Sequence, residues 1–182
     1  MQTIDKLSLL ENLENQVEKH LQITIRIFQN LSDENLLKPS LSGGWSIAQC
    51  LEHLNSYGQY YLPLFESGLA GSSENLGNKI IKSSWLGTKA IDSMDLSKSK
   101  KKFKAFKGHI PASNLDAKAV VSEFINQQER LLKILRIARS KDVQKIKIPI
   151  SIAQFLKLHL GDALQFLVMH NERHIQQANF NL

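Results

Sequence analysis

Cysteine is nearly absent from the sequence, since Cys50 is the single one among 182 residues. This excludes an intramolecular disulfide framework and a zinc site made of several cysteines, and it suits a reducing compartment. Proline and glycine are also scarce, with 4 and 9 residues, while 42% of the residues are hydrophobic. This composition excludes a disordered or collagen-like chain and predicts a globular protein. Any metal site must therefore rely on the 6 histidines.

Long apolar runs are absent as well. No stretch approaches the roughly 18 apolar residues that cross a membrane, and the N-terminus shows no basic region followed by an apolar segment. We therefore expect a cytoplasmic protein with no membrane partner. A length of 182 residues predicts one domain, residues 1–182. The formal net charge of +6 is basic but moderate.

Apolar residues recur at spacings of three or four in four segments, which predicts four amphipathic helices. In the first segment, for example, Leu9, Leu13 and Val17 share one face, with glutamates between them. Four such helices with no competing set of strands predict an all-α protein, a four-helix bundle. The expected helices cover residues 9–31, 46–65, 114–139 and 162 to near the C-terminus.

Helix-start signals mark two of these segments. Ser46 is followed three residues later by Gln49, which is the pattern of a capping box. Trp45 precedes this box and is expected to pack on Cys50 as a hydrophobic staple. Asp162 is expected to cap the last helix.

Two connections are much longer than a tight helix hairpin requires. Residues 68–113 are rich in Lys, Ser, Gly and Asn, and we expect a long crossover there with one short helix at 80–89. Before the last helix, the alternation of Ile146, Ile148 and Ile150 predicts an extended connection, with a short turn opening at Ser151 as an alternative. Connections of this length permit an up-up-down-down arrangement, and the pattern does not determine which helices are neighbours.

Three histidines lie on apolar helix faces. His170 and His174 are spaced i, i+4, so both rings lie on the inward face of the last helix. His53 lies at the edge of the apolar stripe of the second helix and can meet them across the bundle. Three neutral imidazoles are a common catalytic zinc site, and imidazole also suits nickel, iron and copper. The residues alone leave two interpretations open: a three-histidine metal site, or hydrogen-bonded histidines of the core or its rim.

Two segments resemble the signatures of a known family. Residues 45–54 begin with Trp-Ser and carry His53 eight residues after the tryptophan, and residues 160–177 end in two histidines followed by glutamine. They resemble the first and last signatures of the DinB-like superfamily, and the resemblance covers nearly the whole chain. It implies an up-down-down-up four-helix bundle with His53, His170 and His174 as ligands of a divalent metal ion. Zinc or nickel is the expected ion, with iron as a further candidate.

The resemblance also implies an activity. Characterised members of the superfamily include bacillithiol- and mycothiol-dependent transferases and a mycothiol-dependent isomerase, in which a divalent metal is thought to bind the thiol and favour its thiolate. It therefore implies an S-transferase that uses a low-molecular-weight thiol and a small-molecule substrate. The alternative is a non-catalytic, stress-related bundle that binds a metal or small ligand, with a homodimer as a further expectation. Gln49 stands where the family usually has glutamate, which keeps the cap but removes a carboxylate.

No carboxylate is clearly placed as a general base. A zincin-type protease needs glutamate directly after its first histidine, and here that position is Asn171. Glu172 lies about 200° around the helix from His170 and is expected to point away from it. Glu52 is expected to be a solvated charge on a different face from His53. Any catalysis would then depend on the metal.

Several other residues have weaker claims to a role. Cys50 could add a fourth ligand but is expected to be a small apolar contact. His20 is expected to lie at the rim of the first helix. His109 and His159 fall in connections, and their spacing suggests no partner.

Tyrosine and polar side chains near the histidines offer further candidates. Tyr57 is the tyrosine best aligned with His53, either to direct its hydroxyl at the site or to pack as an aromatic ring. Arg173 and Gln177 are i, i+4 neighbours that either orient the ligands or pair on the surface.

A lysine-rich stretch from Lys98 to Lys107, with Phe103 and Phe106 interleaved, raises the question of nucleic-acid binding. No helix-turn-helix or other nucleic-acid reader motif accompanies it, and lysines in a crossover are usually solvated. We therefore expect no nucleic-acid partner. The hypothesis that an anionic substrate or thiol is held near this basic stretch is favoured over nucleic-acid binding.

Overall fold

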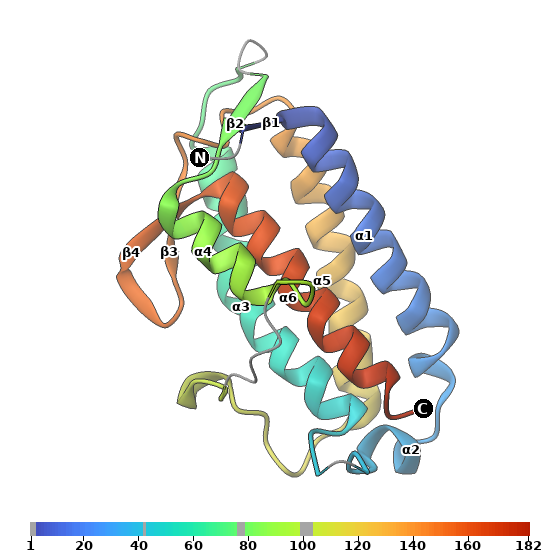
Figure 1. Cartoon of the computed structure of the whole chain (residues 1–182). Helices are drawn as coiled ribbons and strands as arrows, with labels where there is room; N and C mark the ends of the chain where they lie inside the picture. The colour runs from blue at the N-terminus through green and yellow to red at the C-terminus, as the bar shows by residue number, and fades with distance from the viewer. Residues whose placement is uncertain (1–2, 42, 76–78, 99–103) are drawn as a thin grey trace.

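Four long helices dominate the computed structural model, which describes residues 3–41, 43–75, 79–98 and 104–182 (Figure 1). Each long helix buries one apolar face, so the expected four-helix bundle is confirmed. The long helices are α1 (Lys6–Arg26), α3 (Ile47–Ala70), α5 (Ala117–Ala138) and α6 (Leu160–Asn179). The connections contain the short helices α2 (Asp33–Leu37) and α4 (Trp85–Met94) and the single turns η1 (Phe28–Asn30) and η2 (Lys107–His109).

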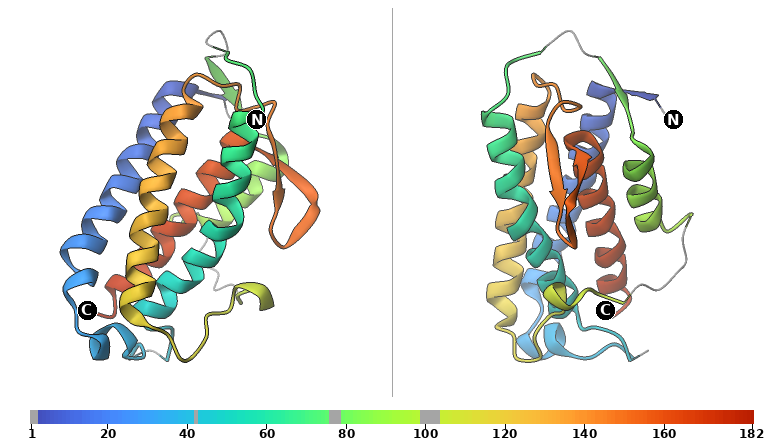
Figure 2. Two further views of the ribbon diagram at one scale, coloured as in Figure 1. Left: turned by 180° about the vertical axis from the view of Figure 1, so that it is seen from behind. Right: turned by 90° about the vertical axis from the view of Figure 1, so that its left-hand side faces the viewer.

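The four long helices are arranged up-down-down-up. Both α1 and α3 pack against α5 and α6, so α1 and α3 lie on a diagonal of the bundle. α1 and α6 run in one direction, and α3 and α5 run in the other (Figures 1 and 2). The crossover after α3 carries the chain back to the end where α3 began, which makes α3 and α5 parallel. The topology implied by the family resemblance is confirmed, and the up-up-down-down arrangement does not occur.

Two helix ends differ from the predicted ones. α3 continues past the expected end at Phe65 to Ala70, although Pro63 lies inside it, because Leu69 is buried in the core. α1 ends at Arg26, and the chain then forms the tight turn η1, which buries Phe28. Periodicity alone does not distinguish such a turn from a continuing helix.

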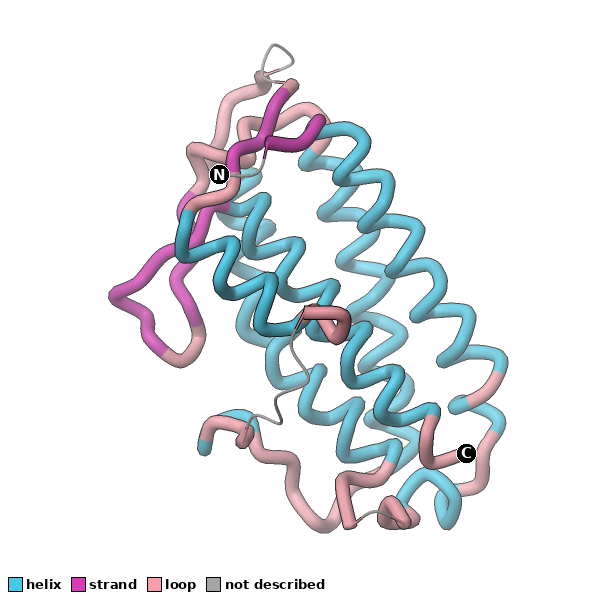
Figure 3. The backbone as a smooth tube through the Cα atoms, viewed as in Figure 1, coloured by secondary structure: helices cyan, strands magenta, loops and turns pink. Residues whose placement is uncertain are grey.

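A short strand pair closes one end of the bundle and was not predicted. β1 (Thr3–Asp5) pairs antiparallel with β2 (Ile80–Lys82), with Ile4 opposite Ile81. The expected short helix at 80–89 is therefore partly wrong, because residues 80–82 are extended and α4 begins at Trp85. Ser84 determines this start, since its side chain accepts a hydrogen bond from Gly87 N. The strands gather toward the end of the bundle where α1 and α6 begin (Figure 3).

The connection between α5 and α6 is a β-hairpin. β3 (Lys147–Ile150) and β4 (Ala153–His159) pair antiparallel and project beside α3 (Figure 2). The extended structure predicted from the alternating isoleucines is confirmed by β3, which contains Ile148 and Ile150. Ile146 and Ile148 are both buried. The turn predicted as the alternative at Ser151 is the tip of the hairpin.

Asp162 has a different role from the predicted cap. α6 begins two residues earlier, at Leu160, and its N-cap residue is His159. The buried Asp162 carboxylate instead accepts hydrogen bonds from the backbone N (3.1 Å) and Oγ (3.0 Å) of Ser84. A methyl group at Gly87 would overlap this carboxylate, so glycine is required there. Asp162 therefore fixes the start of α4 against α6.

The interior of the bundle has three levels. Two apolar clusters occupy the two ends, and the chain passes from one to the other along each of the long helices. Between them lies a polar layer to which all four long helices contribute buried side chains. We call the following residues the polar layer: His20, His53, Asn55, Gln127, Gln128, His170 and Asn171. Within the described residues, no helix has the length and apolarity needed to cross a membrane.

Candidate metal centre

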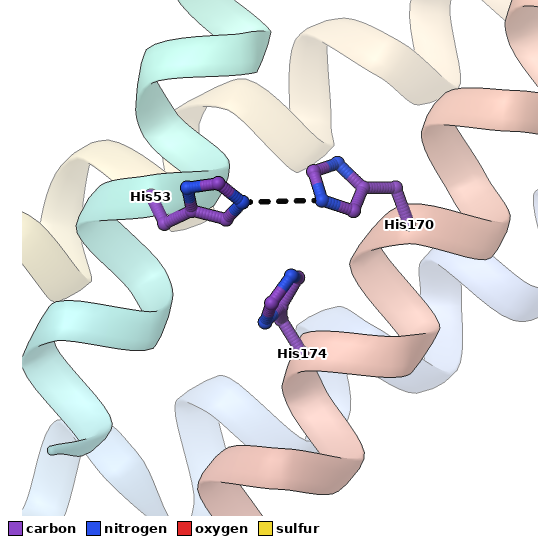
Figure 4. A group of neighbouring side chains, drawn as sticks. All are labelled: His53, His170 and His174. Atoms are coloured by element: carbon purple, nitrogen blue, oxygen red, sulfur yellow. Dashed lines mark hydrogen bonds between the residues drawn. The ribbon is translucent and has the colours of Figure 1, made fainter. Parts of the chain in front are cut away.

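The start of α3 places His53 two turns inside the bundle. Gln49 N donates to Ser46 Oγ (3.1 Å), and Ser46 N donates to Gln49 Oε1 (3.0 Å), so the predicted capping box is confirmed. Trp45 packs against the apolar cluster that contains Cys50. The cap fixes the first residue of the helix, and the resulting register directs His53 toward α6 (Figure 4).

His53 meets His170 and His174 between α3 and α6 (Figure 4). One nitrogen of each ring lies within 4.8 Å of the others, and His53 Nε2 is 3.2 Å from His170 Nε2. His53 and His170 are each only 3% exposed, whereas His174 is half-buried. The structure thus brings together the three histidines that the sequence singled out. We call them the histidine cluster.

Hydrogen bonds on the far side of two rings orient the histidine cluster. His53 Nδ1 donates to the carbonyl oxygen of His109 (2.6 Å), and His174 Nδ1 donates to Gln177 Oε1 (2.9 Å). Both acceptors are carbonyl oxygens, so each ring carries its proton on Nδ1 and directs the Nε2 lone pair at the cluster. Metal-binding histidines are usually supported in this way. His170 Nδ1 is buried and has no hydrogen-bond partner among the described residues.

Burial keeps the three imidazoles neutral. Desolvation is the largest cause of the lowered pKa in each case, and the neighbouring imidazoles lower the pKa of His170 and His174 further. The pKa of His174 falls to about 3, and that of His170 lies well below its ordinary value. Neutral imidazole is the form that binds metals, so this donor set fits a divalent ion such as zinc.

Aromatic rings surround the histidine cluster. The Trp45 ring lies 4.8 Å from the ring of His53, measured between centroids. On the other side, the Tyr57 ring lies 4.4 Å from that of His170, and Phe166 stacks on His170 at 5.7 Å. These apolar walls limit the access of water and strengthen electrostatic interactions inside the site.

Tyr57 is the tyrosine that reaches the cluster, as its alignment with His53 predicted. Its ring makes the contacts, and burial raises the pKa of its hydroxyl to about 12, so the group stays protonated at neutral pH. The Tyr61 hydroxyl is directed elsewhere, since it accepts a hydrogen bond from Ser151 N in the hairpin (3.1 Å).

Cys50 lies outside the group of possible ligands among the described residues. It is fully buried in an apolar cluster, and burial raises the pKa of its thiol to about 12. A protonated thiol is a poor metal ligand. The structure therefore favours the apolar contact over the fourth-ligand role.

His20 is not at the rim, and that prediction is wrong. The side chain is fully buried, and its Nε2 lies 2.7 Å from Glu172 Oε2. Glu172 thus faces α1 and points away from His170, as predicted from its helical position. The hydrogen bond from His20 is the main cause that lowers the pKa of Glu172 to about 2. No carboxylate of the described residues joins the histidine cluster.

No pattern in the sequence pointed to a role for His109. This residue lies in the crossover after α3, yet its ring stacks on Tyr57 with centroids 3.9 Å apart, and its carbonyl holds His53. Ser56, which was also missed, contacts His109 Nδ1 through its Oγ (2.9 Å). His159, in contrast, contacts the carbonyl of Gln144 at the base of the hairpin.

Gln177 and the lysine-rich stretch, which the sequence marked as candidates, have different surroundings in the structure. Gln177 contacts His174, which favours the prediction that it orients a ligand. In the lysine-rich stretch, residues 99–103 lie outside the described residues. Lys98 pairs with Asp92 (2.6 Å), and Lys104 and Lys107 are exposed.

Fold and site together define a class of protein: an up-down-down-up four-helix bundle with a histidine cluster that fits a divalent metal. A family model described as the DinB superfamily matches residues 16–178, and the chain belongs to this superfamily. The resemblance found in the sequence is thereby confirmed.

A solved structure gives a second comparison. It is YfiT from Bacillus subtilis, described as a probable metal-dependent hydrolase with an unusual four-helix bundle topology. The two chains are 18% identical and align with a TM-score of 0.53 over 96% of this chain and 83% of YfiT, which shows a shared fold. No curated protein matches the sequence.

Proposed function

We propose that the chain is a divalent-metal-dependent enzyme in which His53, His170 and His174 hold the ion. We propose further that it transfers the sulfur of a low-molecular-weight thiol to a small electrophile. The observation that carries the proposal is the donor set, in which three neutral imidazoles converge and two are oriented from outside. A bound zinc or nickel ion would lower the pKa of a coordinated thiol and so supply a nucleophile at neutral pH.

The charge of the ligand set supports a thiolate as the nucleophile. Three neutral imidazoles leave the charge of a divalent ion uncompensated, which favours an anionic partner. In the described part of the chain, no carboxylate stands at the cluster to take a proton from water, and Glu172 is held by His20. In the proposed reaction the thiol releases its proton to solvent, a sulfur–carbon bond forms, and the leaving group departs with the bonding electrons.

The surrounding side chains have supporting roles in this proposal. The rings of Trp45, Tyr57 and Phe166 limit the access of water to His53 and His170, which would reduce the solvation of a thiolate bound there. His109 and Gln177 hold two of the ligands in the required orientation. The description of YfiT as a probable metal-dependent hydrolase supports metal dependence in this fold.

Metal analysis tests the first step. Wild type, His170→Ala and His159→Ala are purified without a nickel column, and their metal content is measured by mass spectrometry. We expect about one ion per chain in the wild type and in His159→Ala, and a near-complete loss in His170→Ala. Equal metal content in all three proteins would refute the assignment of the ligands.

Activity assays test the second step. The zinc- and nickel-loaded proteins are incubated with a panel of low-molecular-weight thiols and electrophiles, and with ester and amide substrates without thiol. We expect thiol consumption that stops in chelator and in His170→Ala. Hydrolysis of an ester or amide without thiol would contradict the proposed transferase activity and indicate a hydrolase instead.

A non-catalytic bundle, as a monomer or a homodimer, is the rival from another class. It predicts metal-dependent thermal stability but no metal-dependent turnover with any substrate of the panel. Sedimentation with and without metal would show whether the ion is linked to assembly.

A further inference from the structure

A closed ring of three hydrogen bonds joins the crossover to the histidine cluster. His53 Nδ1 contacts the His109 carbonyl oxygen (2.6 Å), and His109 Nδ1 contacts Ser56 Oγ (2.9 Å). Ser56 Oγ in turn donates to the carbonyl oxygen of His53 (2.7 Å). Two of these residues lie one turn apart on α3, while the third comes from η2, more than fifty residues further along the chain.

The chemistry of the groups determines which atom carries each proton. A hydroxyl has one hydrogen, and Ser56 uses it on the carbonyl of His53. His109 Nδ1 must therefore donate to Ser56 Oγ, which places the proton of His109 on Nδ1. His53 must likewise donate through Nδ1, because its partner is a carbonyl. All three donors and all three acceptors are thus matched.

We propose that His109 is a positioning residue of the metal centre, which holds the ring of His53 in the tautomer and orientation that metal binding requires. The inference rests on the proposed function, since it concerns the same site. It adds a residue from the crossover to a site otherwise built from α3 and α6.

The side chain of His109 fixes the position of the His109 carbonyl, which accepts the hydrogen bond from His53. Its ring stacks on Tyr57 at 3.9 Å with an angle of 24° between the planes, and its Nδ1–H is tied to Ser56. The flanking Phe106 and Ile110 are more than half exposed and contribute little packing of their own. Removal of the His109 side chain would therefore free the turn η2 (Lys107–His109) and withdraw the acceptor from His53.

Metal binding and docking of η2 are expected to stabilise each other. Both favour the tautomer of His53 that carries its proton on Nδ1, because the metal takes the Nε2 lone pair and the carbonyl takes the Nδ1 proton. Coupling between two binding events is reciprocal. A bound ion should therefore protect the segment that carries His109.

Metal affinity is the first test. Zinc binding is measured by competition with a chromophoric chelator for wild type, His109→Ala, His109→Phe and Ser56→Ala, with His159→Ala as the control for loss of a histidine from the other connection. We expect His109→Ala to weaken zinc binding about tenfold to a hundredfold. His109→Phe keeps an aromatic ring for Tyr57 and should lose less, and His159→Ala should match the wild type.

A double substitution tests whether the ring of hydrogen bonds acts as a unit. His109→Ala combined with Ser56→Ala should weaken zinc binding no more than His109→Ala alone, because both remove the same anchor. Fully additive losses would contradict a shared role. Circular dichroism of the metal-free variants shows that each one folds.

An NMR measurement on metal-free protein gives a readout that does not depend on zinc. The Nδ1–H proton of His53, assigned by its loss in His53→Ala, should exchange slowly with solvent in the wild type and become undetectable in His109→Ala. Trypsin provides a second readout, since cleavage after Lys104 and Lys107 should slow when zinc is added to the wild type but not to His109→Ala.

The outcomes separate the two proposals. In one outcome, the wild type binds zinc while His109→Ala shows the same affinity and the same His53 proton exchange. That result overturns the role of His109 and leaves the proposed function intact. Failure of the wild type to bind zinc or nickel overturns the proposed function and the role of His109 with it.

Discussion

The polar layer of the bundle has two halves that are equally buried but differ in how their hydrogen bonds are satisfied. The amide half consists of Asn55, Gln127, Gln128 and Asn171. Asn55 Nδ2 donates to the Val120 carbonyl, Gln127 Nε2 to the Asn55 carbonyl, and Asn171 Nδ2 to Gln128 Oε1, at 3.0 to 3.1 Å. These bonds connect α3, α5 and α6 to one another. One buried acceptor in this half, Asn55 Oδ1, has no partner among the described residues.

The histidine half consists of His53 and His170 with the half-buried His174 beside them, whereas His20 pairs with Glu172. The hydrogen bonds of this half are incomplete among the described residues. His53 Nε2 and His170 Nε2 lie 3.2 Å apart, and His53 already has its proton on Nδ1. Without a metal, His170 Nε2 must donate to His53 Nε2. The buried His170 Nδ1 then carries a lone pair with no hydrogen-bond donor among the described residues.

His170 has a single proton for the lone pairs of His53 Nε2 and His174 Nε2, and a cation would satisfy these lone pairs together. The amides, in contrast, find donors and acceptors within the protein, apart from Asn55 Oδ1. This difference agrees with the proposal that the histidines bind a metal ion, while the amides hold the helices in register.

The largest expected effect is the response of the histidine half to zinc. Free zinc at about 1,000 times its dissociation constant should raise the free energy of unfolding of the wild type by about 4 kcal/mol. His170→Leu should abolish this gain. In chelator the same variant should have about the stability of the wild type, because leucine removes the unpaired His170 Nδ1 but leaves the buried His53 Nε2 without its donor. Urea unfolding with zinc and with chelator measures both quantities.

His20→Leu is the matched control, because His20 is buried in the same layer but pairs with Glu172. It should lose stability in both conditions and keep the full gain from zinc. A zinc gain that survives in His170→Leu would show that the histidine half does not hold the ion.

The histidine half could be predicted from the sequence, and the amide half could not. His170 and His174 have a spacing that brings two rings to one face, and the capping box at Ser46 fixed the phase of His53. In the sequence, Asn171 was noted only because it stands where a zincin-type protease has its catalytic glutamate. Its partner Gln128 lies on α5, and nothing in the local sequence of either residue points to the other.

Contacts made across the crossover also escaped prediction, for a related reason. The helices follow from local periodicity and caps, which are encoded within a few residues. The bond from Ser84 to Asp162 and that from His53 to the His109 carbonyl join residues 78 and 56 positions apart. Such partners depend on how the connection folds over the bundle, so Asp162 was mistaken for a local cap. The expectation of one domain over residues 1–182 stays a prediction.

The next largest effect is expected from a change in the amide half. A methyl group at Gly58 would overlap Oε1 of the buried Gln127. Gly58→Ala should therefore force this side chain to move and break its bond to Asn55, at a cost of about 3 kcal/mol. The loss should be the same with zinc and with chelator, because the amide half has no part in metal binding.

Gly71→Ala, at the C-cap of the same helix, provides the control for Gly58→Ala. A methyl group there would meet only Ser67 O at 3.5 Å, an ordinary contact, so its stability should change little. A loss in Gly58→Ala that appeared only in the presence of zinc would mean that the two halves of the layer are coupled.

A smaller effect is expected from the pair formed by Asn171 and Gln128. Asn171→Leu leaves Gln128 Oε1 buried without its donor and should cost about 2 kcal/mol. Combining it with Gln128→Leu should recover most of this loss, since two apolar groups of similar size leave nothing unpaired. Urea unfolding of the two single variants and the double variant completes the cycle. If the double variant lost the sum of the two single losses, the pair would not be a self-contained part of the amide half.

The smallest effect concerns the support of His174. Gln177→Ala removes the acceptor of His174 Nδ1–H, so the ring is free to turn or to change its tautomer. We expect zinc affinity to fall about tenfold, or about 1.4 kcal/mol, with little change in stability in chelator. Gln176→Ala is the matched control, because the neighbouring side chain bonds to Glu172 on the other face of α6 and should leave affinity unchanged. Equal affinities of both variants, measured by chelator competition, would show that the histidine half keeps its geometry without outside support.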